Sequence, residues 1–181
     1  RPIDASQYDV IYGGAQKNVG PASVVIAIIR EDLIREDVLP GTPTMLKYKT
    51  HADAGSMYNT PPTYGIYICG KVFKWLLRNG GLEAMRDYNV KKAGILYDYL
   101  DSSRLFHNQV VKADRSLMNA TFVTGDPDLD ARFVTEAAAA GFVNLKGHRS
   151  VGGMRASIYN AMPMEGVEKL TRFMEEFEKK I

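Results

Sequence analysis

The chain has 181 residues, of which 45% are hydrophobic and 24% charged, and its formal net charge is +2. This is the composition of an ordinary globular protein, and the length fits one domain or parts of two. Lysine and arginine are scattered singly, so no basic block indicates nucleic-acid binding. Three histidines and one cysteine are too dispersed for a recognisable metal site, and one cysteine excludes an internal disulfide, which fits a reducing cytoplasm.

The N-terminal part of the sequence predicts two strands and a long loop. Residues 8–12 form a short apolar run that ends at Gly13 and Gly14. Residues 22–30 are β-branched and almost continuously apolar, which is typical of a strand buried on both faces of a parallel or mixed sheet. Residues 40–63 show no clean period, so they are expected to form a loop of the kind that often carries function.

Two helices are expected next. Residues 63–81 are apolar on most faces and end at a Gly-Gly pair, which indicates a largely buried helix. Cys69 lies within it and is interpreted as a buried small residue rather than a nucleophile. Residues 82–100 keep helical spacing and are long enough to connect two units.

The last part of the chain predicts a small α/β layer. Its expected elements are a strand at 115–125, a helix at 129–141, strands at 142–147 and 152–162, and a helix at 164–180. The last helix is amphipathic, with apolar residues on one stripe. The sequence therefore predicts an α/β protein with an incomplete sheet unit at 1–75, a connecting helix at 76–100 and a small domain at 101–181.

Lys17 stands in a turn of small residues, "GGAQKNVG". A lysine amine can form a Schiff base with a carbonyl cofactor, most often pyridoxal 5′-phosphate (PLP), and small neighbours allow a planar ring to approach. Taken alone, this signal is weak, and a solvated loop charge is the favoured explanation of a single lysine in a turn. A phosphate-binding loop is disfavoured, because that motif requires Gly before the lysine and Ser or Thr after it, whereas Asn18 follows here.

Two further segments offer groups that bind anions. Asn59 and Thr60 lie in a loop stiffened by two prolines and suit a phosphate ester, although the same residues also form plain turns. His148 and Arg149 are adjacent, and Arg155 follows a Gly-Gly pair inside an apolar strand. A guanidinium grips carboxylate or phosphate through two hydrogen bonds, so these residues predict an anionic small ligand. A solvated turn with a paired arginine is the alternative.

The motifs "GAQKNVGPA", "GSMYNTPPT", "GHRSVGGMRASIYNAM" and "DRSLMN" occur in this order along the chain. Together they resemble the phosphoserine aminotransferases, PLP-dependent enzymes of class V and fold type I. The resemblance covers essentially the whole chain, which is similar to the C-terminal half of such an enzyme. It implies amino transfer from glutamate to 3-phosphohydroxypyruvate in serine biosynthesis, by a homodimer.

The resemblance also implies a role for each candidate residue. Lys17 would be the Schiff-base lysine and proton carrier, and Gln16 would contact the cofactor phosphate. The pair Asn59 and Thr60 would reach the cofactor phosphate of the neighbouring subunit. The pair His148 and Arg149 would hold the substrate phosphate, and Arg155 would grip the α-carboxylate.

The family's enzymes are about twice as long as this chain. The resemblance implies a missing N-terminal half that carries the aromatic ring stacked on the pyridine and the aspartate paired with its nitrogen. We therefore expect little transaminase activity from the chain alone and expect that half as a complementing chain. Two alternatives stay open: a non-catalytic α/β interaction fragment, and another class V enzyme such as a cysteine desulfurase, which needs a cysteine in a mobile loop.

Overall fold

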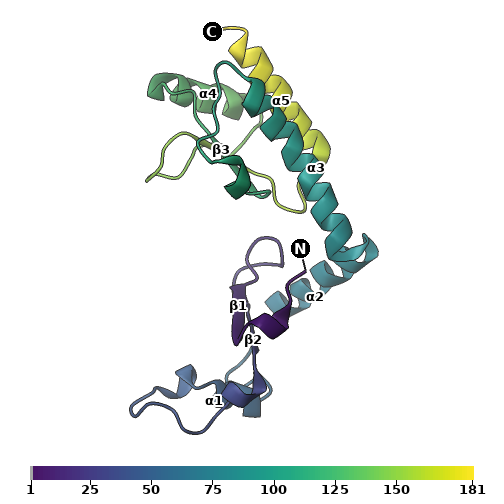
Figure 1. Cartoon of the computed structure of the whole chain (residues 1–181), viewed down its shortest axis with the longest axis vertical. Helices are drawn as coiled ribbons and strands as arrows, with labels where there is room; N and C mark the ends of the chain where they lie inside the picture. The colour runs from purple at the N-terminus through teal and green to yellow at the C-terminus, as the bar shows by residue number, and fades with distance from the viewer. Residues whose placement is uncertain (1) are drawn as a thin grey trace. The chain divides into compact units, whose positions relative to one another are not determined.

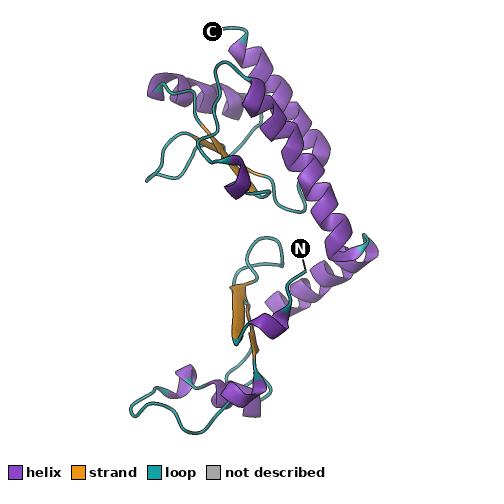
Figure 2. Cartoon of the chain, viewed as in Figure 1, coloured by secondary structure: helices purple, strands orange, loops and turns teal. Residues whose placement is uncertain are grey.

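The structure is a computed structural model that describes residues 2–181, and the chain divides into two compact units, Arg1–Leu82 and Glu83–Ile181. Figure 1 follows the chain through both units, and Figure 2 shows that helices and short strands occur in each. Among the helices of residues 2–181, none combines the length and the apolar composition that crossing a membrane requires.

The first unit is built around one pair of strands. Strand β1 (Val10–Gly14) pairs antiparallel with β2 (Val25–Ile29), so that Val10 lies opposite Ile29 and Gly14 opposite Val25. Both predicted strands are thus present, in slightly different ranges. Helices α1 (Tyr48–Asp53) and α2 (Thr63–Arg78) follow, and short 3-10 helices occur at Ala5–Gln7, Glu31–Leu33 and Thr44–Leu46.

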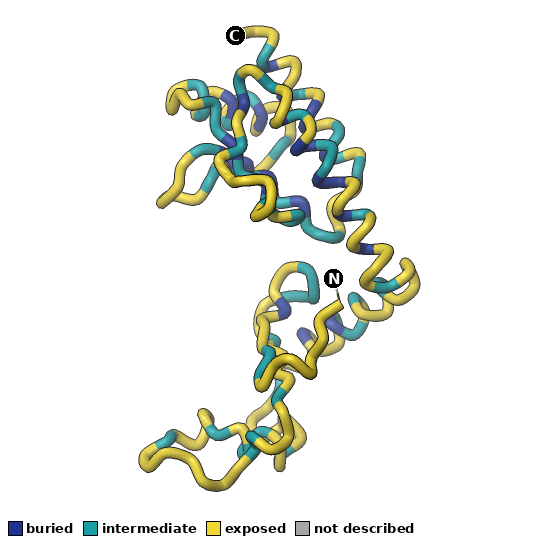
Figure 3. Tube along the Cα trace, in the orientation of Figure 1, coloured by how far each residue is buried: buried dark blue, intermediate teal, exposed yellow. Residues whose placement is uncertain are grey.

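The predicted burial of these elements is wrong. Val25 and Ile28 of β2 are 70% and 55% exposed, and α2 buries only Gly65 and Cys69. The reason is the small number of neighbours, because within residues 2–181 β2 pairs with β1 alone and its apolar side chains lack a covering layer. Figure 3 shows how few positions of this unit are buried. The prediction that Cys69 is a buried residue is confirmed.

The turn between β1 and β2 packs closely on α2. A Cβ atom at Gly20 would lie 2.6 Å from the Sγ of Cys69, and one at Gly65 would lie 2.8 Å from the Cγ2 of Val24. Such distances are far below van der Waals contact. Glycine at these two positions therefore lets the turn and the helix approach each other.

Gly20→Ala is expected to destabilise the first unit by about 1–3 kcal/mol, as overpacking of a tight contact does. Trp75, the single tryptophan, lies on the same helix as Cys69, so its fluorescence during urea denaturation measures the effect. Gly13→Ala is the matched control, because its Cβ would meet no heavy atom within 4 Å. Adding Cys69→Ala should restore most of the loss, and a Gly20→Ala variant as stable as the parent would contradict the packing argument.

The two long helices predicted for the middle region are confirmed. The loop predicted at 40–63 is interrupted by a helix. Helix α2 ends at Arg78. Gly80 then takes a positive φ of 87°, and α3 (Gly81–Ser102) begins at Gly81, whose φ is 74°. The predicted loop at 40–63 contains α1, in which Lys49 and Asp53 form an ion pair of 2.9 Å at i,i+4 spacing. This pair supports a helical turn where no hydrophobic period announces one.

The second unit is a small α/β layer, as predicted. Strand β3 (Asn119–Phe122) pairs antiparallel with β4 (Met154–Ser157), and the helices α4 (Pro127–Ala139) and α5 (Met164–Glu178) are those expected from the pattern. The strand predicted at 142–147 is wrong. Only an isolated bridge from Lys146 to Met154 forms there, because Asn144 at φ 62° breaks the extended run.

The core of the second unit is aromatic and continuous. The rings of Phe106 and Phe133 lie 5.0 Å apart at 68°, and Phe133 also meets Phe177 edge-on at 5.2 Å. Residues of α3 from Ala93 to Leu100 join the same cluster. Helix α3 is therefore part of this core over its C-terminal half.

An ion pair fixes the segment before β3 to α3. Arg115 donates from Nη2 and Nη1 to the two carboxylate oxygens of Asp101, at 2.6 and 3.0 Å, and its guanidinium lies 4.9 Å from the ring centre of Tyr97. Lys112 adds a contact of 3.0 Å. The hydrogen bonds from Arg115, followed by those from Lys112, lower the pKa of Asp101 below its usual value.

The stability of the second unit should therefore fall in acid, in part through Asp101. A carboxyl group whose pKa is lower in the folded state contributes stability above its unfolded pKa and loses it as the pH falls through the folded value. Asp101→Asn should thus show a smaller loss of urea midpoint between pH 7 and pH 3 than the parent. Asp98→Asn, an exposed position of the same helix, is the control and should keep the parent's pH dependence. If the urea midpoint of Asp101→Asn fell as much between pH 7 and pH 3 as that of the parent, Asp101 would not contribute to this pH dependence.

Candidate active site

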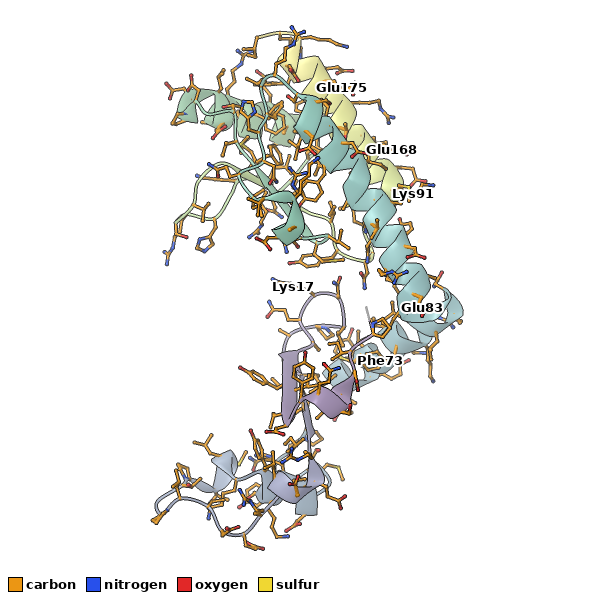
Figure 4. All side chains as sticks on the ribbon, viewed as in Figure 1. Lys17, Phe73, Glu83, Lys91, Glu168 and Glu175 are labelled. Atoms are coloured by element: carbon orange, nitrogen blue, oxygen red, sulfur yellow. The ribbon has the colours of Figure 1, made fainter. Side chains whose placement is uncertain are left out.

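Lys17 lies in a tight turn directly after β1. The turn is closed by hydrogen bonds from Gly20 N to Ala15 O at 2.9 Å and from Lys17 N to Gly20 O at 3.0 Å. Lys17 has a φ of 101°, and Ser23 in the same turn has a φ of 100°. Residues other than glycine rarely adopt such angles, and they concentrate at functional sites. Figure 4 shows the Lys17 side chain projecting outward from the turn.

The backbone beside Lys17 is open. A Cβ atom at Gly13 or Gly14 would meet no heavy atom within 4 Å, so a flat group can approach the main chain there. Gln16 is exposed next to Lys17 and bridges to Gly20. The structure thus brings Gln16 and Lys17 together, beside an uncovered strand end.

Asn59 and Thr60 lie in a different loop of the same unit, between α1 and α2. Both are exposed, and the amide nitrogen of Asn59 contacts the sulfur of Met45 at 3.4 Å. This weak partner leaves most of the amide's hydrogen-bonding capacity for other groups.

His148 and Arg149 lie in the turn before β4, and both are exposed. Gly147 N donates to Gly153 O at 2.7 Å, and Gly152 N donates to His148 O at 2.8 Å. Nδ1 of His148 lies 2.6 Å from the hydroxyl of Ser150. A short, closed turn therefore presents the imidazole and guanidinium groups together to solvent.

Arg155 occupies β4 opposite Thr121 and is half-buried. Its Nε atom is buried and has no hydrogen-bond partner within residues 2–181. A buried charged donor without an acceptor is costly, so this site suits an anion or another acceptor from outside the described residues. That a ligand carboxylate is this partner of Arg155 stays a prediction.

Beside Arg155 lies a hydrogen-bonded group that the sequence prediction did not assign. Ser157 Oγ donates to Asn119 Oδ1 at 3.1 Å, and the amide of Asn119 donates to the Tyr159 hydroxyl at 3.2 Å. Asn119 and Ser157 are register partners, and the period of two along β4 puts Arg155 on the same face. The alternation of polar and apolar residues in "MRASIY" is the signal that could have found them.

The chain matches known proteins over almost its whole length. A family model described as aminotransferase class-V matches residues 1–170. Phosphoserine aminotransferase of Nitrosomonas europaea is 59% identical over 179 residues, which are 99% of this chain and 49% of that protein. The chain spans about half the length of the curated relatives that it matches.

Solved structures of phosphoserine aminotransferases are also similar to this chain. Phosphoserine aminotransferase from Bacillus circulans subsp. alkalophilus superposes with a TM-score of 0.95 and 47% identity, over 99% of this chain and 50% of that one. A PLP-bound phosphoserine aminotransferase from Trichomonas vaginalis gives 0.90 and 41%, over 97% of this chain and 50% of that one. These matches confirm the predicted α/β fold class and the predicted resemblance. Since the family model covers residues 1–170 of 181, the chain belongs to the class-V aminotransferase family.

Proposed function

We propose that this chain is the C-terminal half of a PLP-dependent phosphoserine aminotransferase. The reaction is transfer of the amino group of glutamate to 3-phosphohydroxypyruvate, giving 2-oxoglutarate and 3-phosphoserine in serine biosynthesis. The observation that carries the proposal is the close similarity to phosphoserine aminotransferases along nearly every residue of the chain, with Lys17 in a strained turn at the end of a strand.

The residues around Lys17 fit the cofactor. The open backbone at Gly13 and Gly14, in the strand that leads into the lysine turn, leaves space for a planar ring. When bound, PLP supplies an aldehyde that couples to amines and a ring that accepts electrons. Lys17 would hold the cofactor through its amine and would take and return the proton at the substrate α-carbon, while Gln16 would contact the cofactor phosphate.

The anion-binding residues fit the two substrates. Arg155, with its unpartnered buried Nε, grips the α-carboxylate that glutamate and 3-phosphohydroxypyruvate share. His148 and Arg149 hold the phosphate from across the dimer, and the side-chain carboxylate of glutamate uses the same grip in the other half of the reaction. The turn that carries them is exposed, which supports contact with a ligand bound outside this unit.

The complete site needs more than this chain. Asn59 and Thr60 are exposed, and in a homodimeric enzyme they would contact the cofactor phosphate of the neighbouring subunit. The enzyme would work in the cytoplasm, which the single cysteine of the chain fits. An N-terminal half covers the apolar strands and completes the cofactor bed. For the whole enzyme, residues 1–75 belong to the large domain, 76–100 connect, and 101–181 form the small domain.

The test is reduction with borohydride after addition of PLP, followed by intact mass measurement and peptide mapping. It is run on the chain alone and on the chain co-expressed with the part of the Nitrosomonas europaea relative that it does not cover. We expect a PLP-sized increment on Lys17 and turnover of 3-phosphohydroxypyruvate in the co-expressed sample. An increment spread over many lysines, or no turnover with both halves present, would overturn the proposal and favour a non-catalytic interaction fragment.

A further inference from the structure

Lys92 is a fully buried lysine on α3, with no exposed surface. Its Nζ donates to the carbonyl of Tyr159 at 2.7 Å and to that of Met162 at 3.1 Å, and it lies 4.9 Å from the ring centre of Tyr88. Within residues 2–181 no carboxylate forms an ion pair with it. Burial lowers the pKa of Lys92.

Stability alone does not account for an ammonium group in this place. A buried charge must be desolvated, and an apolar side chain of similar volume would often be neutral or better. Lys92 instead fixes the conformation of one short turn, because its ammonium group donates to two main-chain carbonyls of that turn. Asn89, one helical turn earlier, holds the same turn by donating to the side-chain oxygen of Asn160 at 2.8 Å.

That turn directly follows the strand that carries Arg155. Strand β4 has only four residues and pairs with β3 alone as a named strand, and such a short ladder is marginal in itself. On its other side, the main chain of Arg155 is held by one hydrogen bond, from its N to Leu145 O at 2.7 Å, and the course of the strand beyond Arg155 depends on how its C-terminal end is held. At the C-terminal end, Ile158 N donates to Met118 O at 2.8 Å, and Lys92 fixes the carbonyl of Tyr159 one residue later.

Tyr159 also connects the turn to the face of the sheet on which Arg155 lies. Its hydroxyl accepts from Asn119, and Asn119 accepts from Ser157. Lys92 is thus linked to the immediate neighbours of Arg155 through Tyr159, whose carbonyl it fixes and whose hydroxyl contacts Asn119.

We infer that Lys92 is a positioning residue for Arg155: through the carbonyls of Tyr159 and Met162 it sets the place of the guanidinium that receives a ligand carboxylate. This inference rests on the proposed function for the role of Arg155, but the positioning itself does not require PLP or turnover.

The experiment is side-chain NMR of the chain as it is, without cofactor. The readout is the Nε–Hε signal of Arg155 and its heteronuclear NOE, followed by titration with glutarate as a dicarboxylate probe. Lys92→Met should move the Arg155 signal, reduce its order and raise the Kd for glutarate about tenfold. Lys91→Met, on the exposed surface of α3 (Figure 4), is the matched control and should leave both unchanged.

Tyr159→Phe removes one hydroxyl and keeps the packing, so it serves if Lys92→Met fails to fold. Tyr159→Phe should also move the Arg155 signal. Where both variants fold, the shift of this signal in the double variant should be smaller than the sum of the two single shifts, because both residues act on Arg155 through Tyr159. An Arg155 signal unchanged in Lys92→Met, or unchanged in Tyr159→Phe where Lys92→Met does not fold, would overturn the inference. If glutarate does not bind the parent while Lys92→Met still moves the Arg155 signal, positioning stands and the carboxylate role of Arg155 fails.

Discussion

Phe133→Ala is expected to destabilise the second unit by about 3–5 kcal/mol, the usual cost of removing a large aromatic ring from a closed core. Phe133 on α4 has no exposed surface and contacts four other rings. Their centroids lie between 5.0 and 6.0 Å away, at Phe106, Phe122, Phe173 and Phe177. Because these rings come from several elements, the cavity left by alanine cannot collapse without moving all of them.

The loss can be measured by amide hydrogen exchange of the residues that form this core. Exchange reports each unit separately, which matters because a chain of two units need not unfold in a single transition. Phe73→Ala on α2 (Figure 4) is the control, since Phe73 is 43% exposed and should cost far less. A change below about 1 kcal/mol for Phe133→Ala would mean that the aromatic cluster does not hold the unit together.

Periodicity predicted the elements of the second unit well because that unit contains its own core. The stripe of α5 predicted from the pattern is Val167, Leu170, Phe173, Met174 and Phe177. Four of these residues are buried, and Phe173 is half-buried against the same core. A helical period identifies the buried face correctly when the partners of that face lie in the same chain.

The same reasoning failed for burial in the first unit. The apolar run in β2 and the apolar helix α2 have the composition of interior elements, yet much of both is exposed. Composition records what a segment is suited to pack against, whereas burial also requires that the partner be present. The segment at 142–147 failed for a local reason, because one asparagine in a left-handed conformation interrupts the strand.

The candidate site was predictable in its residue types and less so in its geometry. The isolated charge of Arg155 in an apolar strand predicted the need for a partner, and its buried Nε has none within residues 2–181. The positive φ of Lys17 could not be predicted from the sequence, since lysine rarely adopts that conformation. Lys92 was missed because its two acceptors lie 67 and 70 residues away along the chain.

Lys17→Arg should abolish amino transfer in the enzyme reassembled from both halves. Arginine keeps the positive charge and the unbranched stem, so the strained turn should tolerate it. Its guanidinium stays protonated in proteins, so it offers neither a free amine for an aldehyde nor a base for the α-proton. Loss of a positioned base alone costs about 10²–10⁴-fold in rate, so we expect at least that decrease.

The rate of 3-phosphoserine formation and the mass increment after borohydride reduction measure the effect together. Lys71→Arg, on α2, is the control and should keep the parent's rate and the parent's mass increment. Lys17→Ala separates the roles of charge and amine, because added methylamine can enter the space left by the side chain and restore part of the rate, whereas it should not rescue Lys17→Arg. Retention of more than a tenth of the parent rate in Lys17→Arg would mean that another amine does this chemistry, and the strained turn would then need a different explanation.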